Sequence, residues 1–133
     1  MSDILQPPGW VTPSGYANGI AARGQLIFIA GQIGWNGQCV FESDDLVDQI
    51  EQTLKNIVAV ARAGGAEPAH IVSMTWFLID RKEYSARLKE IGAVYRAVMG
   101  RRFPAMTALQ VSGLIEDRAK VEIQAIAVLP DRE

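Results

Sequence analysis

The apolar residues between positions 46 and 61 recur at steps of three and four, so one face of a helix would carry them all. Ser43 stands just before this stretch and is followed by two aspartates, which is the usual pattern of an N-cap and first-turn acids. Gly64 and Gly65 follow the stretch and suit the left-handed conformation at a helix end. The pattern predicts an amphipathic helix that begins after Ser43 and ends at these glycines.

A second stretch with helical spacing lies between Asp80 and Gly100. Asp80 and Glu83 stand three residues apart, as in a capping box, and apolar residues then recur at helical intervals as far as Val98. Gly100 supplies a stop. The sequence therefore predicts one continuous helix over residues 80–99.

Short, apolar or β-rich segments predict strands. Segments of this kind occupy residues 24–33, 70–79, 106–111 and 120–129. The first is almost wholly apolar and bounded by glycines, as expected for a strand buried on both faces. Residues 34–42 contain turn glycines and are expected to form a hairpin or an extended edge. Residues 5–19, with their prolines and glycines, are expected to form an ordered but irregular arm.

The elements follow one another as β, β, α, β, α, β, β, which predicts an α+β fold with a mixed sheet in a single domain over residues 1–133. Two helices cannot cover both faces of a sheet of five or six strands, so both should pack on one face. The other face would remain apolar and uncovered. We therefore expect a homo-oligomer in which the sheets of several chains pack together.

Composition and charge narrow the function classes. The chain has 133 residues, 49% apolar and 21% charged, and a formal net charge of -2, which is ordinary for a soluble globular protein. Nucleic-acid binders normally gather a basic excess on one face, so a nucleic-acid partner is not expected. Because no apolar run approaches the roughly 20 residues that span a bilayer, and the first residues lack a signal-peptide pattern, we expect a cytoplasmic location and no membrane partner.

Metals and organic cofactors are not expected either. The single cysteine, Cys39, excludes an intramolecular disulfide, and with a single histidine, His70, it cannot form a zinc site of the usual nitrogen and sulfur type. The sequence lacks the motifs of phosphate-binding loops, dinucleotide-binding folds, zinc proteases and serine hydrolases.

One acid in the last predicted strand is a candidate for chemistry. Glu122 lies between Val121 and Ile123 in an otherwise apolar segment, where burial is expected. A buried carboxylate needs a partner or a raised pKa, and either makes it a candidate acid or base. The plainer alternative, that Glu122 lies on a wet strand edge or pairs with an arginine, remains open. Tyr16 and Trp35 could equally line a pocket or fill the core.

Several separated blocks of the sequence resemble the RidA/YjgF family, also called endoribonuclease L-PSP, over almost the whole chain. The blocks read GYANGI and LIFIAGQIGW, then DLVDQIEQTLKNIVAVARAGGA and HIVSMTWFLID, and finally FPAMTALQVSGL and KVEIQAIAVL. The resemblance implies a chorismate-mutase-like fold and a homotrimer. In such a trimer the sheets form an inner barrel, with three small-molecule pockets between the subunits.

The resemblance also implies a chemistry. Members of the deaminating branch hydrolyse reactive imines and enamines, such as 2-aminoacrylate, to 2-keto acids and ammonia. This reaction needs a positioned substrate, a group that binds its carboxylate, and one acid/base residue. Carried over onto this sequence, the family's pocket positions fall on Tyr16, Gly31, Ala108 and Glu122, and Glu122 would orient the water. Trp35 is a further expected substrate-binding residue.

This sequence departs from the family at the carboxylate-binding position. The deaminating branch reads Pro-x-Arg where this chain has Pro104, Ala105 and Met106. A thioether is apolar and cannot form the paired hydrogen bonds of a guanidinium, so activity on 2-aminoacrylate-type substrates should be weak. Ala30 and Gly92 stand where serine and asparagine are common in the family, which makes the expected pocket more apolar.

Two functions therefore stay open. The first is a RidA-like hydrolase or deaminase acting on an imine, enamine or related carbonyl compound, with Glu122 as the general acid/base. The second is a trimer that binds or senses a small ligand without hydrolysing it. A ribonuclease or translation inhibitor, suggested by the family's older name, is disfavoured by the acidic balance of the chain. Neither Arg101 nor Arg102 is an obvious replacement for the missing arginine, because both lie four or five residues earlier and a strand would place them far from position 106 along its axis.

Overall fold

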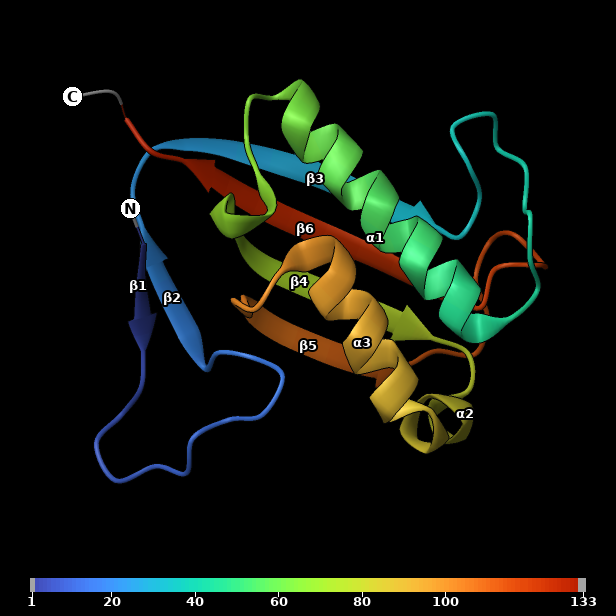
Figure 1. The fold of residues 1–133 in the computed structure, drawn as a ribbon, viewed down its shortest axis with the longest axis horizontal. Coiled ribbons are helices and arrows are strands. Elements are labelled where there is room, and N and C mark those ends of the chain that lie inside the picture. The colour runs from blue at the N-terminus through green and yellow to red at the C-terminus, as the bar shows by residue number, and fades with distance from the viewer. Residues whose placement is uncertain (1, 132–133) are drawn as a thin grey trace.

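The computed structural model describes residues 2–131, which form a layer of helices against one face of a mixed sheet (Figure 1). The sheet has four strands in the order β3-β6-β4-β5, where the sequence predicts five or six. The strands are β3 (Gln25–Ile33), β4 (Ile71–Leu78), β5 (Ala105–Gln110) and β6 (Val121–Leu129). The β4–β5 pair is parallel and both pairs of β6 are antiparallel. The predicted α+β fold is confirmed.

Two long helices, α1 (Leu46–Ala63) and α3 (Leu88–Met99), lie side by side on the same face of this sheet (Figure 1). The core forms between them and the sheet, as the helical periodicity predicts. Its fully enclosed side chains include Ile50, Leu54, Ile57, Trp76, Leu78, Val121 and Ile123. Within residues 2–131, no helix is both long and apolar enough to cross a membrane.

The opposite face of the sheet carries exposed apolar side chains, as predicted. Phe28 is 72% exposed and Leu26 is 56% exposed on β3, and Leu109 is partly exposed on β5. The expectation that residues 24–33 are buried on both faces is therefore wrong for the single chain. Helices cover one face of the sheet, and among residues 2–131 no helix covers the exposed side of β3.

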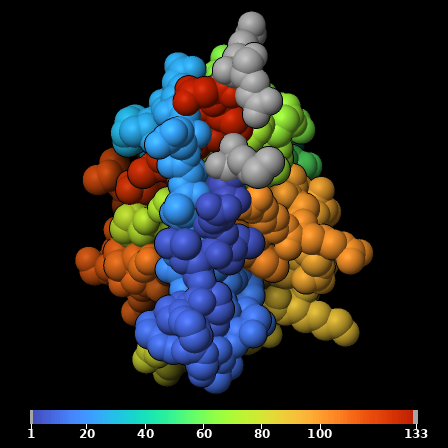
Figure 2. Space-filling view, turned by 90° about the vertical axis from the view of Figure 1, so that its left-hand side faces the viewer, coloured from blue at the N-terminus to red at the C-terminus, as the bar shows by residue number. Residues whose placement is uncertain are grey.

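The N-terminal segment is more regular than predicted. Strands β1 (Ser2–Leu5) and β2 (Gly19–Ala22) pair antiparallel in a separate sheet, where an irregular arm was expected. Figure 2 shows this blue segment crossing the middle of one side of the molecule, with orange segments on both flanks. The hairpin or extended edge expected at residues 34–42 is reduced to one isolated bridge between Trp35 and Phe41.

The helix starts also differ from the sequence prediction. The N-cap of α1 is Asp45 and not Ser43, because the Asp45 carboxylate accepts hydrogen bonds from the backbone N–H groups of Val47 and Asp48. Asp80 caps the next helix as predicted. The expected helix over 80–99 is broken at Arg87 into α2 (Arg81–Ala86) and α3, since the Arg87 backbone leaves the helical region at φ -122 and ψ 25.

The broken helix is tied to α1 by the same arginine. The Arg87 guanidinium donates to Asp45 Oδ1 at 2.6 Å and to Glu90 Oε2 at 2.8 Å. The hydrogen bond from Arg87 holds the pKa of Asp45 below its usual value. One carboxylate therefore both caps α1 and anchors the α2–α3 junction beside the site described below.

Replacing Asp45 by alanine should lower the free energy of unfolding by about 1 kcal/mol, the usual effect of losing an N-cap. Because the folded-state pKa of Asp45 is lowered, its stabilisation is present above the unfolded pKa and is lost as the pH falls through the folded value. Urea denaturation should thus show the variant and the native protein converging below about pH 4. Asp44→Ala, which removes a neighbouring acid that does not cap, is the control. A pH-independent difference would contradict the assignment.

Candidate functional site

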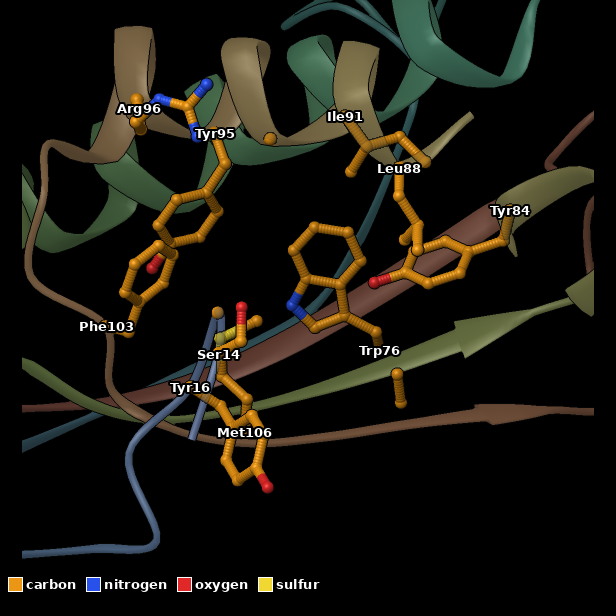
Figure 3. Close-up of a pocket in the computed structure, with 13 residues that line it drawn as sticks. Ser14, Tyr16, Trp76, Tyr84, Leu88, Ile91, Tyr95, Arg96, Phe103 and Met106 are labelled. Carbon is orange, nitrogen blue, oxygen red and sulfur yellow. The ribbon is translucent and has the colours of Figure 1, made fainter. Parts of the chain in front are cut away.

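A cleft of about 610 Å³ lies between α3, α2 and the β5 edge of the sheet (Figure 3). Residues 14–16 of the N-terminal segment close one side of it, and Trp76 of β4 contributes to its floor. Its volume falls within the roughly 300–1,000 Å³ that is typical of small-molecule sites. The cleft draws on parts of the chain far apart in sequence, so it depends on the tertiary fold.

Aromatic rings form most of one wall. Trp76 meets the Tyr84 ring edge-on at a centroid distance of 6.2 Å, and its centroid lies 6.4 Å from that of Tyr95. Tyr95 stacks on Phe103 with centroids 5.0 Å apart and planes 17° apart. Each ring is thereby held by another, so this wall is rigid and suited to the flat face of an apolar molecule.

Two polar atoms in this wall have no acceptor among the described residues. The indole Nε1 of Trp76 and the hydroxyl of Tyr95 are buried and make no hydrogen bond there. Burial raises the pKa of Tyr95, so its hydroxyl stays protonated and remains a donor at neutral pH. A buried donor without an acceptor costs about 1–3 kcal/mol. Both groups would be stabilised by a water or a ligand atom that reaches them.

Helix α3 presents one continuous face to the cleft. Leu88, Ile91, Gly92, Tyr95 and Arg96 follow steps of three and four and all line it. Glycine inside a helix costs about 1 kcal/mol relative to alanine, so its presence at position 92 calls for a local reason. A Cβ atom there would lie 3.2 Å from Nη1 of Arg96, so the arginine occupies the space that a side chain would need.

The β5 side of the cleft carries predicted site residues. Met106 and Ala108 alternate with Thr107 along the strand and both line the cleft, as does Tyr16. The N-terminal segment is fixed there because the Ala17 N–H donates to the carbonyl oxygen of Pro104 at 2.9 Å. The sequence left open whether Met106 faces a pocket, and in the structure it does.

Glu122 lies on a different surface of the same chain. It pairs in register with Phe77 of β4 and with Ile33 of β3, so it belongs to an interior strand and the open alternative of a wet strand edge is wrong. No hydrogen bond or ion pair engages its carboxylate within residues 2–131, and it is half-buried. Gly31 stands against it, where a Cβ atom would lie 2.1 Å from Oε2. Gly31 and Glu122 are therefore neighbours, and the absence of a side chain on one makes room for the other.

The strand register separates these two groups of residues. Met106 pairs with Met74 and lies on the helix-covered face, whereas Glu122 pairs with Phe77 on the uncovered face. Side chains alternate between the two faces of a sheet. Within one chain the structure brings Tyr16, Met106 and Ala108 together, and Gly31 with Glu122, but it does not bring the two groups into one cavity.

The remaining predicted residue, Trp35, lies in neither group. Its ring packs on Phe41 at a centroid distance of 5.6 Å in the segment after β3. Sequence reasoning missed Trp76, Tyr95, Phe103 and Arg96, which all line the cleft. The signal that could have revealed the last of these is a glycine inside the helical pattern, one turn before an arginine. Among the described residues, no group of three or more histidine, cysteine and acidic side chains is placed to hold a metal ion.

The fold and the cleft together define a class: a small α+β protein with an aromatic cleft at one sheet edge and an unpaired acid on the uncovered face. The family described as endoribonuclease L-PSP matches residues 11–129, and the chain belongs to it.

Relatives and solved structures agree with this assignment. The 2-iminobutanoate/2-iminopropanoate deaminase of Capra hircus is 35% identical over 107 residues, covering 78% of this chain and 73% of the goat protein. A Yersinia pestis protein of the Rid family, of unknown function, superposes with a TM-score of 0.85 at 27% identity, over 96% of this chain and 98% of that one. Escherichia coli TdcF with bound serine has a TM-score of 0.70 at 31% identity, covering 92% of each chain.

Proposed function

We propose that the protein is a small-molecule hydrolase that converts an imine or enamine into a carbonyl compound and ammonia, with Glu122 as the general acid/base. The observation that carries this proposal is the free carboxylate of Glu122, which stands on an interior strand beside Gly31 and has no protein partner among residues 2–131. A relative in the same family bears the name of an imine deaminase. Imine hydrolysis needs little more than one such group and a positioned substrate.

The reaction can be written with this one acid/base residue. The carboxylate of Glu122 accepts a proton from a water molecule as the water oxygen bonds to the electrophilic imine carbon. The resulting carbinolamine takes that proton on its nitrogen. Glu122 then transfers the hydroxyl proton to the nitrogen as the C–N bond breaks and the C=O bond forms, so that a carbonyl compound and ammonia leave. A carboxylate that is half-buried and unpaired is free to take up and return the proton in this way.

We propose further that the active assembly is a homotrimer with its sites between subunits. Glu122 and the cleft lie on opposite faces of the sheet in one chain, so a second chain is needed to bring an acid to a cleft. The exposed apolar side chains of Phe28, Leu26 and Leu109 supply a surface whose burial would drive such an association. The same assembly would cover the face that the helices leave open.

Small imino acids are proposed to be poor substrates. Met106 stands where the deaminating branch of the family is expected to carry an arginine, and its thioether cannot pair with a carboxylate. The aromatic wall of the cleft favours a second candidate function, binding of an apolar ligand without turnover, because these rings supply apolar contact area and no carboxylate. A measurement of imine hydrolysis distinguishes the two functions.

The assay follows keto acid and ammonia release when an amino-acid oxidase generates imines from alanine, leucine or phenylalanine in situ. We expect the native protein to accelerate hydrolysis, weakly for the alanine imine, and Glu122→Gln to lose at least about 100-fold of that acceleration, as is typical for removal of an acid/base group. Met106→Arg should raise activity on the alanine imine, since the new guanidinium would line the cleft.

A matched control tests whether the position of the carboxylate, and not only its presence, determines turnover. Gln124→Glu returns a carboxylate two residues along the same face of β6, and in the Glu122→Gln background it should not restore turnover if position matters. Acceleration that survives Glu122→Gln would overturn the catalytic role of Glu122. If no imine is hydrolysed by any form while apolar ligands raise the melting temperature, the binding function is the correct one.

A further inference from the structure

The cleft contains a cationic group that the sequence comparison did not reveal. Arg96, in the last turn of α3, lines the cleft, and in Figure 3 its guanidinium lies on the α3 side, above Tyr95 in this view. Within residues 2–131 no acid pairs with it and no hydrogen bond engages its side chain. By contrast, the guanidinium groups of Arg62, Arg87 and Arg118 all form ion pairs. Arg96 therefore has its hydrogen-bond donors free at the mouth of the cleft.

The position of Arg96 depends on Gly92. One helical turn earlier, Gly92 has no side chain, and a Cβ atom there would lie 3.2 Å from Nη1 of Arg96. A cation in the last turn of a helix also complements the helix dipole, but it can do so from any side of the helix. The dipole explains neither why the guanidinium lies beside the cleft nor why a glycine stands within α3. A site that needs the guanidinium at the cleft mouth explains both.

The other arginines near this end of α3 are placed differently. Arg102 donates to the side chain and backbone of Ser2, and neither Arg101 nor Arg102 lines the cleft. The two candidates considered from the sequence are thus excluded by position. The guanidinium that reaches the cleft comes from the helix, on the side opposite Met106.

The rest of the cleft is suited to the body of a ligand. Beneath Arg96 lie the stacked rings of Tyr95 and Phe103, followed by Trp76 and Tyr84. A cleft of about 610 Å³ is far larger than a four-carbon imino acid needs. Its apolar wall would leave such a ligand without contacts on most sides, whereas a ring or a branched hydrocarbon would fill it.

We propose that this cleft binds carboxylates with a flat, apolar body, and that Arg96 binds the carboxylate while the aromatic wall of Trp76, Tyr95 and Phe103 binds the body. The inference rests on the proposed function in one respect: if the protein hydrolyses imines, its substrates are 2-imino acids with aromatic or bulky side chains. The carboxylate is thereby bound from α3 and not from position 106. Binding itself does not require Glu122.

The experiment measures binding of phenylacetate, a stable carboxylate with an aromatic body, by isothermal titration calorimetry. Two comparison ligands each carry one of the two groups of phenylacetate. 2-Phenylethanol has the ring without the charge, and acetate has the charge without the ring. We expect phenylacetate to bind more tightly than either. Arg96→Met should weaken phenylacetate binding at least about tenfold, the effect expected from loss of a charge-assisted pair, and should leave 2-phenylethanol binding unchanged.

Three variants serve as controls. Arg101→Met removes a nearby surface arginine that does not line the cleft and should leave binding unchanged. Arg96→Lys keeps the charge but loses the planar fork, so it should give an intermediate affinity. Glu122→Gln should bind phenylacetate like the native protein, so a failure of the proposed hydrolysis would leave this binding result intact.

Several outcomes would overturn the proposal. Equal affinities for phenylacetate and 2-phenylethanol would show that no cation contributes, and an unchanged affinity in Arg96→Met would assign any contribution to another group. Absence of phenylacetate binding to the native protein would also refute it. If the phenylalanine imine is hydrolysed, Arg96→Met should raise its KM with little change in kcat, whereas a purely structural role would alter the melting temperature instead.

Discussion

Replacing Phe28 by glutamate is expected to convert the assembled protein into monomers. Phe28 is 72% exposed on the uncovered face of β3 and is the largest apolar side chain there. If that face packs against other copies, the variant would bury a carboxylate without a partner, which costs several kcal/mol per subunit. Sedimentation velocity at micromolar concentration should report about three chains per particle for the native protein and one for the variant.

Val60→Glu is the matched control for this experiment. Val60 lies on the outward side of α1 and is also an exposed apolar residue, but it is on the helix layer and away from the open sheet face. The control should assemble normally. Charges at Ala125 or Ala127 are unsuitable for this test, because both side chains are buried in the core. A native protein that sediments as one chain would refute the proposed assembly.

Gly31→Ala is expected to lower the turnover that depends on Glu122 by about 100-fold. The new Cβ atom would lie 2.1 Å from the carboxylate Oε2, so the carboxylate must move by more than 1 Å to reach an ordinary contact distance. A displacement of about 1 Å at a reacting group commonly costs two orders of magnitude in rate. The effect should appear in kcat. The affinity for phenylacetate should not change, because within one chain the cleft lies on the opposite face of the sheet from Gly31. Steady-state kinetics on the best imine substrate measures it.

Gly37→Ala provides the comparison. A Cβ atom at Gly37 meets nothing within 4 Å, so this substitution places a methyl group on the surface and should leave turnover and stability unchanged. The Gly31→Ala protein should keep its fold, because the clash is with the flexible end of a side chain. Unchanged kcat in Gly31→Ala would mean that the observed position of the carboxylate is not the catalytic one.

Local periodicity predicted the main elements well. The apolar stripe of α1, the two glycines after it, and the β-rich segments of β4, β5 and β6 are all visible in short windows of sequence. The argument that two helices cover one face of a sheet also held, because it follows from the number of elements and not from their details. Periodicity predicts what lies on one face of an element. It does not determine which distant segments pair.

The failures arose where distant contacts decide the structure. Strand β1 pairs with β2 across a long intervening loop, so the contacts that define it are absent from the local pattern. The predicted helix is interrupted at Arg87, whose side chain binds Asp45, 42 positions earlier in the sequence. Asp45 caps α1 in place of Ser43 because the Ser43 hydroxyl instead donates to Asp48 and accepts from the N–H of Asp45.

The candidate site was predictable only in part. The family resemblance pointed to Tyr16, Met106 and Ala108 as pocket positions, and in the structure all three line the cleft, with the Tyr16 segment fixed by the hydrogen bond of Ala17 to Pro104. Tyr84 and Tyr95 fall within the helical pattern of residues 80–99, and such a pattern looks the same in the sequence whether it faces a core or a cleft. Arg96 was overlooked because its freedom from ion pairs is a property of the folded chain.

The separation of Glu122 from the cleft by the sheet has a consequence for how such a protein can change over evolutionary time. Substitutions along α3 or at Met106 alter one surface, whereas Glu122 and Gly31 are constrained by each other and by the neighbouring strands on the opposite surface. In an assembly that joins the two surfaces, residues of the aromatic wall can be substituted without displacing Glu122. One scaffold can then acquire new ligands through substitutions in a single helix, while the acid proposed to react, Glu122, stays unchanged.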